Sequence, residues 1–215
     1  MTSAPAPAGT TRRAAVRAAR KPSRREQVLV TAERLFTEHG FPGTGIDDIG
    51  AAAGVTGPAI YYYFRTKHEL LAAVLTRLTE ELYEASLAVT VEGHEPAEVL
   101  RRLAVVHVEH VFDHRALIGI SVAEQPNMAA VDLGSSVATE RSFLDLWVKA
   151  LRQARPELDA RSARSVAFAA QWLAYGVSFT RIGDTPTMRR RYVDMTMAVL
   201  GAHLAEPRAG NGRTR

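Results

Sequence analysis

Apolar residues recur at three- and four-residue intervals along most of this chain, which is the spacing of one face of an α-helix. In the first such segment Val28, Ala32, Leu35 and Phe36 fall on one stripe. Alternation of apolar and polar residues, which marks a half-buried strand, is rare. The one Asn-Gly pair, at Asn211, stands in a polar tail rather than between strand patterns. The pattern predicts an all-α protein.

Capping residues and helix breakers divide this pattern into separate helices. Three pairs have the spacing of a capping box, in which a hydroxyl and an acid three residues later satisfy backbone N–H groups: Ser23 with Glu26, Thr44 with Asp47, and Thr66 with Glu69. Each cap stabilises its helix by about 1 kcal/mol. The expected helices span 24–39, 45–53, 56–62, 67 onwards, 97–113, 115–125, 130–155, 159–182 and 187–204.

The stretch from Phe41 to Leu70 is the most informative for function. Two short helices are joined there by a tight turn at Gly54, and a capping Thr56 starts the second one. This is the plan of a helix-turn-helix, whose second helix enters the major groove of DNA. The sequence therefore favours a DNA-binding protein.

The second short helix begins with small residues and ends with three consecutive tyrosines, Tyr61, Tyr62 and Tyr63. Neighbouring residues on a helix differ by about 100° in direction, so at least one tyrosine must face outwards. Tyrosine hydroxyls donate to phosphates, and the rings contact thymine methyl groups. The alternative is an ordinary helical hairpin with a tyrosine cluster in its core.

Residues 24–75 resemble the tetracycline-repressor (TetR) family of regulators. The matching residues are Leu35-Phe36, Gly40-Phe41, Thr44, Ile49, Ala53-Gly54-Val55, Ile60-Tyr61, Tyr63-Phe64, Lys67 and Leu70-Leu71. The resemblance implies a three-helix DNA-binding head and a larger helical domain that holds an effector pocket and dimerises through its last two long helices. It also implies two sets of contacts: Gly57, Pro58, Ala59, Tyr61, Tyr62 and Tyr63 with DNA, and Thr44 and Lys67 with phosphates.

The sequence departs from the family pattern at Asp47, which stands where a basic residue often binds phosphate. Gly57 and Ala59 also lack side chains that could read bases. Residues 26–67 hold three basic and five acidic residues, whereas residues 1–25, which include Arg24, hold seven basic residues and no acid. We therefore expect this basic arm to add phosphate contacts, although a solubilising leader is the alternative.

The predicted domains follow from these features. They are a disordered basic arm (1–22), a helix-turn-helix DNA-binding domain (23–67), an effector-binding and dimerisation domain (68–205) and a flexible tail (206–215).

The helix expected over 159–182 carries two apolar rows on opposite faces, and the last helix repeats the pattern. A helix that is apolar on both sides must be covered on both sides, by its own domain and by a second subunit. A central helix in a monomer is the alternative. The predicted dimer interface is Val166, Ala170, Leu173, Val177, Tyr192, Met195 and Val199.

A group of aromatic residues and one histidine in the second domain could line an apolar cavity for the effector. The candidates are His107, Phe112, Phe143, Trp147, Trp172 and Tyr175. His107, His110 and His114 are spaced to lie near one helical face, so they could contact the ligand or bind a metal ion. No metal or cofactor is assigned, and the same residues could be plain core.

The composition limits the other classes of protein. The 215 residues include no cysteine, which excludes disulfides and suits the cytoplasm, and no apolar run approaches the roughly 18 residues of a membrane helix. No nucleophile elbow, P-loop, dinucleotide turn or zinc-protease motif occurs, so an enzyme is not expected. The predicted function is a homodimeric repressor that a small, largely apolar effector releases from operator DNA. The alternative is an architectural DNA-binding protein without an effector.

Overall fold

The computed structural model describes residues 23–90, 93–128 and 134–201, and these residues form helices and connecting turns without a strand. The all-α prediction is confirmed. The α-helices are α2 (Arg24–His39), α3 (Ile46–Ala53), α4 (Gly57–Tyr61), α5 (Lys67–Val89), α6 (Pro96–Asp113), α7 (Arg115–Glu124), α8 (Gly134–Ala154), α9 (Ala160–Tyr175) and α10 (Pro186–Gly201). Two short 3-10 helices are η1 (Gln125–Met128) and η2 (Gly176–Phe179).

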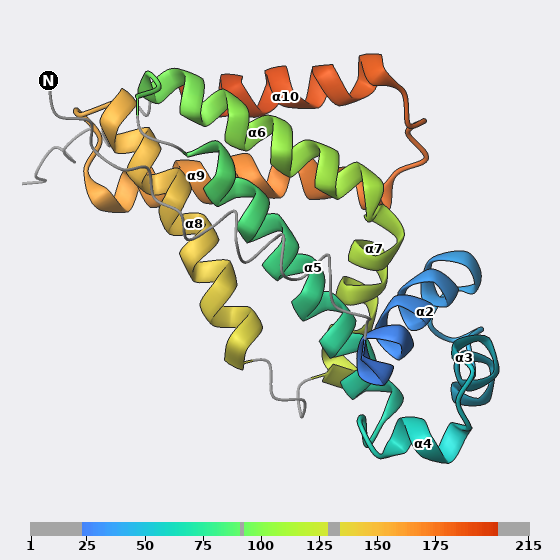
Figure 1. Cartoon of the computed structure of the whole chain (residues 1–215). Coiled ribbons are helices and arrows are strands. Elements are labelled where there is room, and N and C mark those ends of the chain that lie inside the picture. Colours follow the sequence, from blue (N-terminus) through green and yellow to red (C-terminus); the bar gives the residue numbers. More distant parts are fainter. Residues whose placement is uncertain (1–22, 91–92, 129–133, 202–215) are drawn as a thin grey trace, which may run out of the picture.

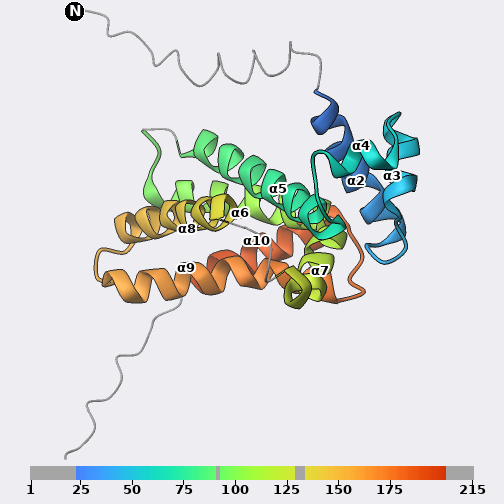
Figure 2. The same cartoon turned by 90° about the horizontal axis from the view of Figure 1, so that it is seen from below.

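The helices form two groups, a small head of α2 to α4 and a larger body of α5 to α10. The head lies at one end of the molecule, and α5 runs from it into the body (Figure 1). Within the body α8 packs against α5, α6 and α9, and α10 packs against α6 and α9 (Figure 2). The helix α7 lies where the body meets the head and contacts α2.

Each group is built around its own hydrophobic core. The head core contains Val28, Phe36, Ile49 and Ile60, which are completely buried. The body core is larger and is centred on α6, α8 and α9. Leu117 of α7 and Met128 of η1 belong to the head core although they follow the body helix α6 in the chain. The α7–η1 segment therefore joins the head to the body.

The predicted caps are present at two of three sites. Ser23 forms a complete capping box with Glu26, and Thr66 accepts a hydrogen bond from the backbone N–H of Glu69 at 3.0 Å. The third prediction is wrong, because α3 starts one residue later, with Gly45 as its N-cap and Asp48 accepting from the Gly45 N–H.

The helix expected over 159–182 is also shorter than predicted. The α-helix ends at Tyr175, and the chain tightens into η2, a four-residue 3-10 helix. The arm (1–22) and the tail (206–215) that the sequence predicts lie outside the described residues.

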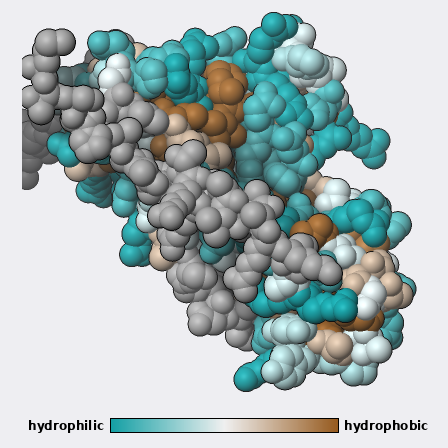
Figure 3. Space-filling view, viewed as in Figure 1, coloured by the Kyte–Doolittle hydropathy of each residue, from teal (hydrophilic) through white to brown (hydrophobic). Residues whose placement is uncertain are grey.

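The face of the molecule drawn in Figure 3 is mainly hydrophilic, with hydrophobic surface gathered in small separate patches. Among the helices of the described residues, none is long and apolar enough to cross a membrane.

Candidate DNA interface and ligand cavity

The turn between α3 and α4 has backbone geometry that depends on glycine. Gly54 has a φ of 67°, in the left-handed region that side chains disfavour, and its N–H bonds the carbonyls of Gly50 and Ala51. Thr56 then caps α4 by accepting from the Ala59 N–H at 3.4 Å. A side chain at Gly57 would place its Cβ 2.2 Å from Asp47 Oδ1. The two helices thus meet closely, in the helix-turn-helix arrangement that the sequence predicts.

All three tyrosines of this segment are exposed, although the helix that presents them is held by buried neighbours. The exposed fractions are 52% for Tyr61, 85% for Tyr62 and 40% for Tyr63, whereas Ile60 and Phe64 are buried in the head core. The Tyr62 and Tyr63 rings meet edge to face at 5.2 Å. Single apolar residues are common on protein surfaces, but adjacent exposed aromatics mark a binding surface.

Two residues expected to contact DNA are buried instead. The Thr44 side chain is 2% exposed, and its hydroxyl donates to the carbonyl oxygens of Gly40 at 2.8 Å and Leu35 at 3.1 Å. It therefore satisfies the end of α2 and does not face a phosphate. Gly57 is buried beneath Asp47, so its small size serves the contact between α3 and α4. Pro58 is exposed and Ala59 is half-buried.

The head and the start of α5 also carry three cations of interest for phosphate binding. Arg24 is exposed in the first turn of α2, and the neighbouring Arg25, which the sequence counts within the basic arm, lies over the Phe64 ring at 5.0 Å. Lys67 starts α5, where free N–H groups and its own charge favour anions, and its Nζ lies 4.3 Å from the centre of the Phe41 ring. Partial burial lowers the pKa of Lys67, against the opposing effect of Glu124.

The row predicted as a dimer interface largely faces the interior of its own subunit. Val166, Ala170, Val177 and Tyr192 are buried in the body core, so they cannot meet a second copy. Leu173 and Val199 are half-buried, and Met195 is 41% exposed. The opposite row of α9 is the exposed one.

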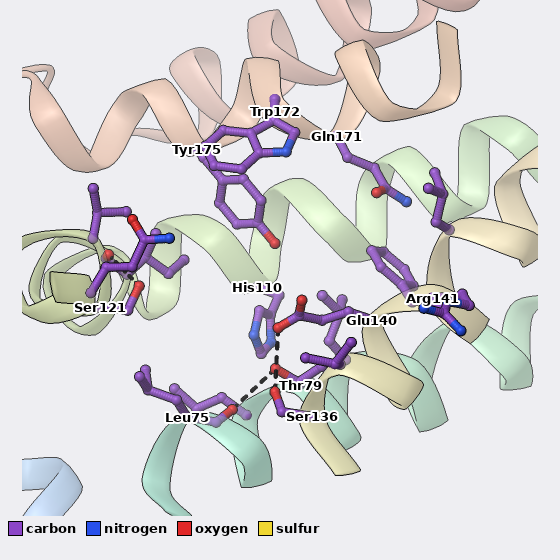
Figure 4. A pocket seen from close by; sticks show the side chains of 18 of the residues that line it. Leu75, Thr79, His110, Ser121, Ser136, Glu140, Arg141, Gln171, Trp172 and Tyr175 are labelled. Carbon is purple, nitrogen blue, oxygen red and sulfur yellow. Dashed lines mark hydrogen bonds between the residues drawn. The ribbon is translucent and has the colours of Figure 1, made fainter. Parts of the chain in front are cut away.

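A cavity of about 810 Å³ opens in the body, with walls from α5, α6, α7, η1, α8 and α9 (Figure 4). This is a common size for a small-molecule site. Of the six predicted pocket residues, Phe143, Trp172 and Tyr175 line it.

The other three predicted pocket residues lie behind the wall of the cavity. Trp147 is fully buried, and Phe112 is enclosed by Tyr192 and the Arg189 guanidinium. The His107 ring packs edge to face on Tyr175 and Trp147 and donates from Nε2 to the Gln171 carbonyl oxygen at 2.9 Å. Burial lowers the pKa of His107 to about 4, so this imidazole is neutral at physiological pH.

The histidine that does line the cavity is His110, which the sequence treated only as a possible ligand or metal contact. Burial, with a smaller effect of His114 and His107, lowers the pKa of His110 to about 3. Burial raises the pKa of Tyr175 to about 12, with Glu140 adding to the effect. The cavity therefore presents a neutral imidazole and a neutral phenol.

Further polar residues of the wall were not singled out by the sequence reasoning. Ser136 and Glu140 of α8, Ser121 of α7 and Gln171 of α9 line the cavity among leucine, valine and aromatic side chains. Ser136 and Gln171 are buried, Ser121 is half-buried and Glu140 is exposed, so no common burial pattern in the sequence could have picked them out. Among the described residues no group of three or more potential metal ligands comes together. His107, His110 and His114 therefore do not form a metal site with one another or with a nearby acid.

Comparison with known proteins agrees with this arrangement. Residues 28–74 match the family model described as bacterial regulatory proteins, tetR family. The chain is 25% identical to the HTH-type transcriptional repressor NicS of Pseudomonas putida over 156 aligned residues. This alignment covers 73% of this chain and 71% of that protein. The chain is 26% identical over 144 residues to the HTH-type transcriptional repressor KstR2 of Mycobacterium tuberculosis, across 64% of this chain and 72% of that protein.

A solved structure has the same fold. The structure of AibR in complex with isovaleryl coenzyme A and operator DNA matches with a TM-score of 0.66 at 20% identity, over 82% of this chain and 97% of that chain.

Proposed function

Because this chain belongs to the tetR family of bacterial regulatory proteins, we propose that it is a homodimeric transcriptional repressor released from its operator by a small molecule in the body cavity. The chain is a DNA-binding transcriptional regulator and not an enzyme. We propose in addition that it forms a dimer, binds an effector and represses transcription.

One observation carries the proposal of effector release, namely that the α7–η1 segment contributes to both the cavity and the head. Ile118 and Ser121 of α7 line the cavity, while Leu117 packs into the head core. Met128 of η1 belongs to both. A ligand that moves this segment must therefore also move part of the head core, because packed cores change between discrete arrangements.

A second connection runs through polar side chains. The ring of His110, at the cavity, lies 4.6 Å from the ring of His114, whose Nδ1 is 3.8 Å from a Glu33 carboxylate oxygen on α2. Glu33 also pairs with Arg77 of α5. The cavity wall and the first helix of the head are thus linked by a short chain of contacts.

The proposed dimer forms through the outward faces of α9 and α10. Phe168 and Trp172 of α9 are half exposed although they also line the cavity, and Met195 of α10 is 41% exposed. Ala169 and Ala198 are exposed beside them. Apolar side chains of this size on two adjacent helices are suited to an isologous contact with a second copy. Two heads held this way would read two half-sites of one operator.

The proposal assigns operator contact to residues 23–67 and effector binding and dimerisation to residues 68–205, within the cytoplasm. Tyr61, Tyr62, Tyr63 and Pro58 would face the major groove. Arg24, Arg25 and Lys67 would contact phosphates, with the arm (1–22) adding more of them.

The competing function is an architectural DNA-binding protein without an effector. Such a protein has no use for an 810 Å³ cavity whose wall is shared with the DNA-binding head. The cavity is therefore the feature that favours the repressor.

Selection of DNA from a random library tests the proposed function. A dimeric repressor selects one palindromic motif, whereas an architectural protein selects none. On the selected DNA, Tyr62→Ala should weaken binding at least about fivefold, because a lost base or phosphate contact costs about 1–3 kcal/mol.

The thermal midpoint of Tyr62→Ala should stay unchanged, because this side chain is 85% exposed. Leu87→Ala, an exposed apolar residue on α5, is the control and should bind as the unmodified protein does. A library that yields no motif, or a Tyr62→Ala variant with full affinity, would contradict the proposal.

A further inference from the structure

The helix α8 carries a carboxylate on the stripe that faces the body interior. Ser136, Phe143, Trp147 and Leu151 on this helix are buried, and Glu140 follows Ser136 by four residues and precedes Phe143 by three. This spacing puts Glu140 within the same helical stripe. Glu140 itself is exposed, so its carboxylate lies beside this buried row without being enclosed by the core.

Glu140 lines the cavity, where its carboxylate has a hydrogen-bond partner. Its carboxylate accepts a hydrogen bond from the Ser136 hydroxyl at 3.3 Å, and it lies close enough to Tyr175 to raise the pKa of that phenol. Figure 4 shows the Glu140 carboxylate in the middle of the cavity, between the Tyr175 hydroxyl and Thr79. The acid is thus presented to whatever occupies the cavity.

The surroundings of this carboxylate are suited to a cation. Phe168, Trp172, Tyr175 and Phe143 line the same cavity, and the electron-rich faces of aromatic rings attract cations. Among the described lining residues Glu140 is the one acid and Arg141 the one permanent cation. Arg141 is the next residue on α8, about 100° further around the helix and off the core-facing stripe.

The other basic group of the wall carries no charge to offer an anion. Burial holds the pKa of His110 at about 3, so its imidazole is neutral above that pH. An acidic headgroup placed beside Glu140 would therefore be repelled, with no charged imidazole there to offset the carboxylate.

We propose that the cavity binds an apolar amine, with its protonated nitrogen on the Glu140 carboxylate and its hydrocarbon body against the leucine and aromatic walls. This inference rests on the proposed function, since it takes the cavity as the effector site. It specifies that the effector carries a positive charge, which the apolar walls of the cavity alone do not indicate.

Three probes with the same ten-carbon chain test the proposal: decylamine, decan-1-ol and decanoate. Each is titrated into the full-length protein at pH 7.5, with calorimetry and tryptophan fluorescence as readouts. The amine should bind about tenfold more tightly than the alcohol, and decanoate should bind most weakly. Glu140→Gln should bring the amine to the level of the alcohol.

The matched control is Asp145→Asn. Asp145 is an exposed acid on the same helix that pairs with Arg164 at 2.7 Å, outside the cavity lining. This variant should keep the full preference for the amine. If Glu140→Gln fails to fold, the ranking of the three probes on the unmodified protein decides the question alone.

The outcomes separate this inference from the proposed function. Binding of decanoate as tightly as the amine, a preference that survives Glu140→Gln, or no binding of any probe overturns the amine site. If decanoate binds best and dissociates selected operator DNA, the amine site falls and the repressor stands. If the amine binds as expected and leaves operator affinity unchanged, the ligand class stands and effector release falls.

Discussion

The head and the body of this protein obtain their functional residues in different ways. In the head, the features that set the helix ends are local: a capping box at the start of α2, a left-handed glycine at position 54 and a cap at Thr56 for α4. In the body, the cavity wall comes from six helices, from Leu75 of α5 to Tyr175 of α9. A DNA-reading surface can thus be encoded locally, whereas a ligand cavity depends on how distant helices pack.

The largest effect is expected from a charge placed on the outer face of the body, where we propose that the dimer forms. Ala169→Arg puts a charge on the exposed face of α9 and should convert a dimer to a monomer. Operator affinity should then fall by about a hundredfold or more, because two linked heads gain that much from effective concentration. Light scattering and binding to selected DNA measure the two effects.

Two matched substitutions sharpen this result. Val166→Arg, in the row that the sequence assigned to the dimer, should instead unfold the protein, because it buries an unpaired charge in the body core. Ala85→Arg, at an exposed position of α5, should leave both properties unchanged. A dimeric Ala169→Arg protein would show that the contact lies elsewhere.

The prediction of the dimer interface chose the wrong face of α9, because sequence periodicity does not say which face is covered by the same subunit. The two apolar rows of α9 have equal spacing, and the sequence does not say which of them meets the subunit's own core. The neighbours decide: Val166 and Ala170 meet the other body helices, while Phe168 and Trp172 stay exposed. Packing between distant segments, not local pattern, fixes the choice.

The cavity was predicted in part for the same reason. Aromatic residues gather in the body, but Trp147 fills the core whereas Trp172 stands at the cavity. Nothing local distinguishes them. Even in the head, Thr44 has the spacing of a cap but is used to bond the end of α2, because the neighbouring Gly45 with Asp48 fits the start of α3 better.

A smaller effect is expected on the pH dependence of folding stability, which the buried histidines of the body should determine. The body holds His107 and His110 neutral, with pKa values lowered by burial to about 4 and about 3. An unfolded histidine gains its proton near pH 6.5, so between there and the folded pKa the unfolded state binds more protons. Stability should therefore be complete above pH 6.5 and fall as the pH is lowered towards 4, by up to about 1.4 kcal/mol per pH unit for each histidine.

Urea denaturation between pH 7.5 and 4.5 measures this loss. His107→Gln, which keeps a donor for the Gln171 carbonyl oxygen, should lower stability at pH 7.5 but show a shallower decline with acid. An equal slope in both proteins would mean that His107 is not held neutral by the fold.

The central claim is that the cavity and the DNA-binding head are coupled through α7 and η1. Thermodynamic linkage makes this claim symmetrical: a ligand that weakens operator binding must itself bind more weakly to the operator complex, by the same factor. The most direct test titrates whichever of decylamine, decan-1-ol and decanoate binds most tightly into free protein and into protein saturated with selected operator. The account predicts affinities that differ by about tenfold, matched by an equal loss of operator affinity at saturating probe. Equal probe affinities for the free and DNA-bound protein would contradict it.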